Sequence, residues 1–327
     1  MLLFVQRRSN VSERPRMILT LACSDTPRTR RLLDGSIGIE GCDLRTNSFP
    51  PEEMFRRAFE DAEFDISELS FATSMLHIDR GTCPYVGIPV FPSRAFRHAA
   101  IYVRSDGSIT KPDDLRGRNI GVRNYLNTAA LVVRGLFSDV YGISAEDIHW
   151  WIGDVDRVER DTIPIPRLLR PANIQAAQGR TLSAMLMDGA IDAIVHYHPP
   201  RGFGGADAPI RRLFADTAAA ERDYYRSTGI FPIMHMVGIR HDVYERDPSL
   251  AVRVYDAFNA VGYVAVAPKP LRPDTSSIDI AAPEFWRNGV GPNRAALECL
   301  IRYGFEQGLT SRPLTMGDLF IPALLTT

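Results

Sequence analysis

The apolar run from Ile230 to Ile239 constrains the fold more than any other stretch of the chain. It follows a polar helical segment around residues 224–226, and its length and β-branched residues predict a buried strand. Pro232 lacks an amide hydrogen, so we expect either an edge strand or a crossover between two units. The imidazole of His235 within this run needs a hydrogen-bond partner or a ligand, because an unpaired buried polar group is costly.

Short apolar segments alternate with amphipathic segments along most of the chain, a pattern typical of α/β proteins. We expect strands at residues 17–23, 41–49, 65–70, 85–91, 98–104, 119–123, 148–152, 191–197 and 209–214. We expect helices at residues 28–33, 50–64, 71–80, 128–141, 181–189, 248–266 and 293–307. Residues 154–175, rich in arginine and proline, form a long predicted loop, either a lid over a site or a solvated excursion.

A second strand-and-helix unit begins after residue 104. If the strand at 230–239 pairs with the first unit, the chain crosses twice between two domains. The first domain is then discontinuous, residues 17–103 plus 229–327, and residues 104–228 form an inserted domain with a ligand cleft between them. Two α/β domains joined by two hinge crossings make a two-lobed, type II periplasmic-binding-protein-like fold.

Composition excludes several partner classes. The 327 residues carry a formal net charge of -1, which gives no reason to expect nucleic acid or an anionic membrane surface. No apolar run approaches the roughly 18 residues of a transmembrane helix. The four cysteines lack CxxC spacing, which argues against a zinc knuckle and favours reduced thiols in the cytoplasm. We expect a small-molecule partner.

The N-terminal residues admit two interpretations. A twin arginine at Arg7 and Arg8 and the letters TLAC resemble parts of a secretory signal. The apolar segment that follows, 17–22, is shorter than the roughly 7–15 residues of a signal core. We therefore expect residues 1–16 to be a flexible extension before a first strand.

Five segments carry a sharper resemblance. IPVFPSRAFRHAAIYV, DDLRGRNIGV, TGIFPIMHMV, NRAALECLIRYGFEQGL and the opening ACSDTPRTRRLLDG resemble, in the same order, segments of the 4,5-dihydroxyphthalate decarboxylase family. The similarity extends from about residue 18 to 320. The resemblance implies a cytoplasmic carboxy-lyase of phthalate degradation that converts 4,5-dihydroxyphthalate to protocatechuate without an organic cofactor.

Such a reaction needs an acid that protonates the ring carbon, a group that polarises a hydroxyl and cations that hold the retained carboxylate. Histidine has a suitable unperturbed pKa, and the candidates are His196, His198 and His235. His196 and His198 share one strand face and could bind a divalent metal with Asp25 or Glu68 as a third ligand. These residues leave open whether a divalent metal binds. His235 could equally be a structural imidazole that is hydrogen-bonded to the backbone.

Anionic substrate groups favour arginine forks and helix N-termini at strand ends. Asp25 joins the three histidines among the catalytic candidates. The substrate-binding candidates are Arg94, Ser93, Arg28, Arg30, Asn124, Thr128, Arg226 and Glu68. The HYHPPRGFGG segment and the loop at 154–170 are expected to distinguish between ring substitution patterns.

One alternative comes from another class of protein. A solute-binding protein of the transporter type uses the same two-lobed fold to hold a small aromatic or carboxylate ligand without chemistry. Histidines that converge on the cleft favour the enzyme. Apolar helices such as 295–305 could support a homo-oligomer.

Overall fold

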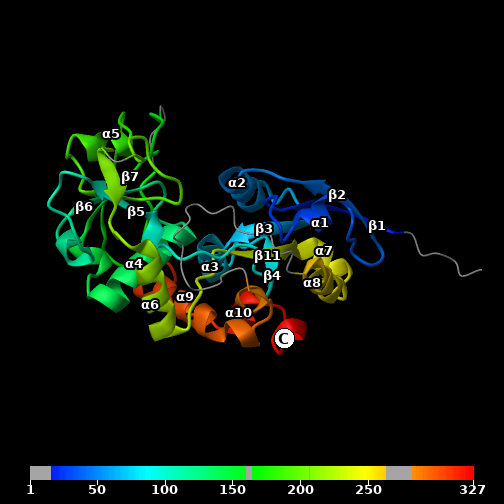
Figure 1. Ribbon diagram of the computed structural model, residues 1–327. Coiled ribbons are helices and arrows are strands. Elements are labelled where there is room, and N and C mark those ends of the chain that lie inside the picture. Colours follow the sequence, from blue (N-terminus) through cyan, green and yellow to red (C-terminus); the bar gives the residue numbers. More distant parts are fainter. Residues whose placement is uncertain (1–15, 160–163, 206, 263–281) are drawn as a thin grey trace, which may run out of the picture.

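The computed structural model describes residues 16–159, 164–205, 207–262 and 282–327. Two lobes lie side by side, each built on its own sheet, with α4, α6 and α9 near their junction (Figure 1). This arrangement confirms the expected two-lobed α/β fold. Residues 1–15 of the expected N-terminal extension and the end of the helix expected at 248–266 lie outside the described residues.

The first lobe contains a sheet in the order β2-β1-β3-β11-β4, in which β11 runs antiparallel to both neighbours. Its strands are β1 (Met17–Ala22), β2 (Cys42–Asn47), β3 (Ile66–Ser70), β4 (Tyr85–Ile88) and β11 (His235–Arg240). Its helices are α1 (Arg30–Leu33), α2 (Pro51–Asp61), α3 (Phe71–Asp79), α7 (His241–Arg246), α8 (Leu250–Val261), α9 (Arg294–Glu306) and α10 (Met316–Leu319). The helices cover both faces of the sheet with apolar side chains.

The second lobe contains a sheet in the order β10-β5-β9-β6-β7-β8. Its strands are β5 (Ile101–Arg104), β6 (Asn119–Val122), β7 (His149–Ile152), β8 (Asn173–Ala176), β9 (Ala193–Val195) and β10 (Ile210–Arg212). Its helices are α4 (Thr128–Tyr141), α5 (Leu182–Met187) and α6 (Thr217–Thr228). Short 3-10 turns lie at His98–Ala100, Pro112–Leu115, Ala145–Asp147, Pro283–Trp286, Gly291–Asn293 and Pro322–Leu324.

Local signals explain why the helices begin and end where they do. The Asn127 side chain accepts from the amide of Ala130 at the start of α4, and Gly142 ends the helix in a left-handed conformation with φ +62°. Pro51 and the acidic Glu52 occupy the first turn of α2, where a missing amide hydrogen costs nothing and negative charge is stabilised.

The structure corrects three details of the expected strands. The strand assigned to residues 98–104 within the first domain begins at 101 and pairs with β9 and β10, so the first crossing precedes it and the boundary after residue 103 is too late. The return strand begins at His235, between β3 and β4, and Pro232 lies in the segment that leads into it from α6, so the crossover alternative agrees with the structure and the edge alternative is wrong. The predicted loop at 154–175 contains the start of β8, an exposed edge strand with little apolar signal.

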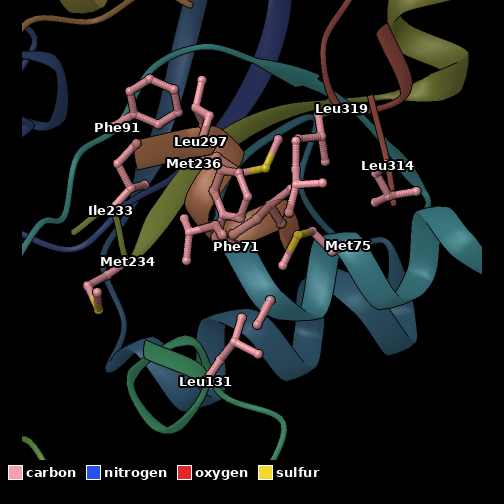
Figure 2. Packing of buried hydrophobic residues seen from close by; sticks show 14 of the residues in the cluster. Phe71, Met75, Phe91, Leu131, Ile233, Met234, Met236, Leu297, Leu314 and Leu319 are labelled. Carbon is pink, nitrogen blue, oxygen red and sulfur yellow. The ribbon is translucent and has the colours of Figure 1, made fainter. Parts of the chain in front are cut away.

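The two lobes share part of one apolar core. Leu131 of α4 belongs to the same cluster of buried residues as Phe71 and Met75 of α3 and Leu297 of α9, and Figure 2 shows Phe71 between Leu131 and Leu297. Because α4 belongs to the second lobe and the other helices to the first, this core fixes the lobes against each other on one side. Among the helices that the structure describes, none combines the length and the apolar character that crossing a membrane requires.

Candidate active site

His235 and Glu68 form a hydrogen-bonded pair where β11 begins. The Nδ1 atom of His235 lies 2.6 Å from Oε1 of Glu68. In the antiparallel register Val237 is opposite Glu68. His235, two residues before Val237, is therefore the diagonal neighbour of Glu68 on the same face of the sheet. This pairing brings together two residues that are 167 positions apart in the sequence.

The Glu68 carboxylate is 1% exposed, yet it has partners for both oxygens. Its Oε2 accepts from the amide of Ser24 at 2.7 Å, at the end of β1. Burial alone would raise the pKa of Glu68, but the hydrogen bonds from His235 and Ser24 and the charge of His235 hold that pKa below its usual value. Burial of the Cys23 thiol, followed by the negative charge of Glu68, raises the pKa of that thiol well above its usual value. Glu68 is therefore an ionised carboxylate.

The other side of the His235 ring faces α2. The ring of Phe55 lies edge-on to it, with centroids 4.8 Å apart. The His235 side chain keeps 17% of its surface exposed, in contrast to Glu68. The Nδ1 edge of the imidazole is thus fixed by the carboxylate, and part of the side chain remains accessible to another molecule.

One helical turn before Phe55, Glu52 joins the two lobes. Its Oε2 accepts from Nε of Arg123 at 2.9 Å, and its Oε1 accepts from the hydroxyl of Tyr197 at 3.3 Å. Arg123 follows β6 and also pairs with Asp154, whereas Tyr197 follows β9, so both partners come from the second lobe. We call Glu52, Arg123 and Tyr197 the interlobe contact. It lies on the same face of α2 as the contact with His235.

Arg28 and Arg94, both predicted to bind substrate, converge on residues 286–293. The Arg28 guanidinium donates to the carbonyl of Trp286, and that of Arg94 donates to the carbonyl of Arg287. Arg94 is 8% exposed, and burial, followed by the nearby charge of Arg28, lowers its pKa to about 9. Within the described part of the chain, no carboxylate forms an ion pair with Arg94. The guanidinium groups of Arg28 and Arg94 are thus adjacent, and Arg94 has no acidic partner among the described residues. This arrangement favours the binding of an anion.

The crossing segments bring Ser93 next to His235 through the backbone. The carbonyl oxygen of Ser93 accepts from the amides of Met234 and His235, at 2.9 and 3.3 Å. Ser93 therefore holds the start of β11 in place. This contact uses the main chain of Ser93, whereas the sequence predicted a side chain that binds substrate.

His196 and His198 lie on the second lobe, after β9. The amide of His198 donates to Nδ1 of His196 at 3.2 Å, and the ring centroids are 5.9 Å apart. Burial, before other causes, lowers the pKa of His196. Glu68, one proposed third metal ligand, is engaged with His235 instead. Over the ranges that the structure describes, no three His, Cys, Asp or Glu side chains are grouped to hold a metal ion.

Other predicted site residues have local partners. Asp25 and Arg30 form a surface ion pair at 2.8 Å, and Arg226 pairs at 3.7 Å with Asp223 where both are largely exposed. Asn124 caps its own turn by accepting from the amide of Leu126. These contacts do not connect these residues to His235.

Thr128 joins the two lobes rather than facing an open helix end. Its hydroxyl accepts from the amide of Ala72 at 3.1 Å and shares a hydrogen bond with the hydroxyl of Ser70. Ser70 is opposite His235 in the sheet and caps α3. The first turns of α3 and α4 therefore meet beside the His235 pair.

Sequence reasoning missed Phe55 beside His235, Arg97 in the first crossing, and the three residues of the interlobe contact. The interlobe residues are Glu52 of α2 and Arg123 and Tyr197 of the second lobe. Two signals were available, because Glu52 opens an acidic helix N-terminus and Tyr197 lies between the two candidate histidines. Neither signal indicates which side chain of the other lobe it meets.

No family model matches this chain. The 4,5-dihydroxyphthalate decarboxylase of Comamonas testosteroni is 35% identical over 325 residues, which cover 94% of this chain and 97% of that protein. A protein of the same name from Pseudomonas putida is 37% identical over 212 residues, 64% of this chain and 81% of its own length.

Solved structures share the fold at low sequence identity. The desulfurization enzyme DszB is 14% identical with a TM-score of 0.56, covering 95% of this chain and 98% of its own. A putative periplasmic sulfonate-binding protein SsuA from Methylobacillus flagellatus KT is 12% identical with a TM-score of 0.54, covering 94% and 92%. An enzyme and a binding protein thus share this architecture, so the fold alone does not decide between them.

Proposed function

Because this chain belongs to the 4,5-dihydroxyphthalate decarboxylase family, we propose that it removes one carboxylate from a dihydroxylated benzene dicarboxylate. The substrate is 4,5-dihydroxyphthalate, and the products are protocatechuate and carbon dioxide. The observation that supports this chemistry is the pair of His235 with the buried, ionised Glu68, next to the interlobe contact.

His235 acts as the general acid. Glu68 accepts the hydrogen of Nδ1, so Nε2 of the imidazolium carries the proton that is transferred. The hydroxyl para to the leaving carboxylate supplies electron density, and the ring carbon that bears this carboxylate takes the proton. The bond from that carbon to the carboxylate then breaks, carbon dioxide leaves and its electron pair restores the aromatic ring. The hydroxyl keeps its proton throughout, and His235 is reprotonated from solvent.

Neighbouring residues position the reactants. Glu68 does not touch the substrate but fixes the imidazole orientation, which makes it a positioning residue. Phe55 packs against the His235 ring and supplies an aromatic neighbour that orients the substrate ring beside His235. The guanidinium groups of Arg28 and Arg94 add positive potential that favours a dianion.

Incubation of the purified chain with 4,5-dihydroxyphthalate tests the proposal, with carbon dioxide and protocatechuate followed by mass. Formation of both products is expected. Thermal stabilisation by the diacid without product would instead identify a binding protein. A parallel reaction with a chelator tests whether a divalent metal is needed, because His196 and His198 were considered as ligands. Independence of an organic cofactor, a cytoplasmic location and a homo-oligomer stay predictions.

A further inference from the structure

Arg97 lies where the two crossing segments between the lobes run side by side. The amide of Ala95 donates to the carbonyl of Pro232 at 3.1 Å, and the carbonyl of Ser93 accepts from the amide of His235. These backbone contacts place the segment that carries Arg97 against the segment that leads into β11. The position of Arg97 near the start of that strand is therefore fixed by the main chain.

The partner of the Arg97 guanidinium is unusually weak. Its Nε donates to Sδ of Met234 at 3.0 Å, and a thioether is a poor acceptor for one of the five N–H groups that arginine carries. In the described parts of the chain, no carboxylate lies within ion-pairing distance of Arg97. Arg123, also at the lobe junction, pairs with two carboxylates. Arg97 thus has N–H donors that are left for another molecule.

Arg97 is partly buried, so holding its charge without a paired carboxylate costs free energy. Burial lowers its pKa to about 10, so the guanidinium is still charged at neutral pH. A cation in such a place is stabilised when an anion binds beside it, because the pair offsets the loss of hydration.

Two sets of contacts relate Arg97 to the proposed active site. Met234, its hydrogen-bond partner, directly precedes His235. On the other side, Arg97 is close enough to Tyr197 for the charge of each to affect the pKa of the other. Tyr197 in turn bonds to Glu52, one helical turn from the Phe55 ring that contacts His235.

We propose that Arg97 binds the carboxylate that the substrate retains and thereby selects an aromatic acid with two adjacent carboxylates. This inference rests on the proposed function. The two carboxylates of a phthalate lie on neighbouring ring carbons, so a cation for the retained group has to lie near the acid that protonates the other carbon. Arg97 contacts Met234, the residue before His235, and its planar fork matches a carboxylate.

Binding of two inert analogues tests the inference without turnover. Dissociation constants of phthalate, with two carboxylates, and benzoate, with one, are measured by calorimetry for the wild type and for Arg97→Met. We expect the wild type to prefer phthalate by about 30-fold or more, as for a desolvated charge pair, and the variant to prefer it by less than about threefold. Arg97→Lys, which keeps the charge without the fork, should retain an intermediate preference.

Arg246→Met is the matched control, because Arg246 is 62% exposed and paired with Asp242 on the surface. It should keep the wild-type preference, and circular dichroism of both variants checks folding. An undiminished preference in Arg97→Met, or no preference in the wild type, would overturn the inference. If Arg97→Met loses the preference while the wild type forms no protocatechuate, the proposed function fails and the assignment of Arg97 stands.

Discussion

The imidazole of His235 donates from Nδ1 to a carboxylate, Glu68, that is almost completely buried, at 2.6 Å. Glu68 is held in turn by the amide of Ser24, at the end of the neighbouring strand β1. A side chain fixed at one nitrogen can present the other to a substrate with little rotational freedom. This relationship between the two residues is the structural basis of the proposed proton transfer.

Glu68→Gln should lower kcat while leaving substrate affinity nearly unchanged. The amide keeps the size of the side chain but removes the charge that stabilises the imidazolium and can donate to Nδ1 instead of accepting. We expect kcat to fall roughly 10²-fold, the lower end of what general acid–base catalysis contributes. Steady-state kinetics and calorimetry separate the two effects. Glu63→Gln, at an exposed ion pair with Arg57, is the control and should stay within about twofold of the wild type.

Glu52→Gln should weaken substrate binding modestly through the interlobe contact. Glu52 and Arg123 are 49% and 28% exposed, so the ion pair is worth no more than about 1 kcal/mol, which corresponds to roughly a fivefold change in the dissociation constant. Glu53→Gln is the control. Glu53 lies in the same helical turn as Glu52, but its carboxylate pairs with Arg57 inside the first lobe. Calorimetry should show weaker binding for Glu52→Gln alone, and equal affinities of the two variants would argue against a role for the contact.

His98 should make the fold less stable in mild acid. It is 2% exposed between Phe214 and Tyr224, and burial lowers its pKa to about 4. The unfolded chain, with a histidine pKa of about 6.5, binds more protons between these values, so stability falls as pH falls. His98 then accounts for about 2 kcal/mol of the loss between pH 7.5 and 5. Urea unfolding of His98→Phe should show a smaller loss than the wild type over this range, and an identical loss would contradict the assignment.

Much of the fold could be predicted from local signals. Helix α4 follows the predicted bounds 128–141 because a cap at Asn127 and a glycine at 142 define both ends. Sheet membership could not be predicted in the same way. The strand at 101–104 and the central place of β11 are decided by pairing between distant segments, about which local apolar patterns carry no information.

The site was predictable as residue types but not as contacts. His235 and Glu68 were both candidates, yet their pairing depends on the register of β11 against β3. Arg30 and Arg226 have the right chemistry at expected strand or helix ends, but they form exposed ion pairs with nearby acids. Arg97 was not predicted, because its proposed role follows from its surroundings in the fold and not from its sequence context. Those surroundings are the thioether of Met234 and the second lobe.

The most direct test of the account is the rate of protocatechuate formation by His235→Asn at saturating 4,5-dihydroxyphthalate, measured beside the dissociation constant. Asparagine can still donate to Glu68 but cannot protonate carbon. We expect a fall in kcat of at least about 10²-fold, because the acid acts in the transition state, with binding within about tenfold of the wild type. A variant that keeps the wild-type kcat would contradict the assignment of His235 as the proton donor.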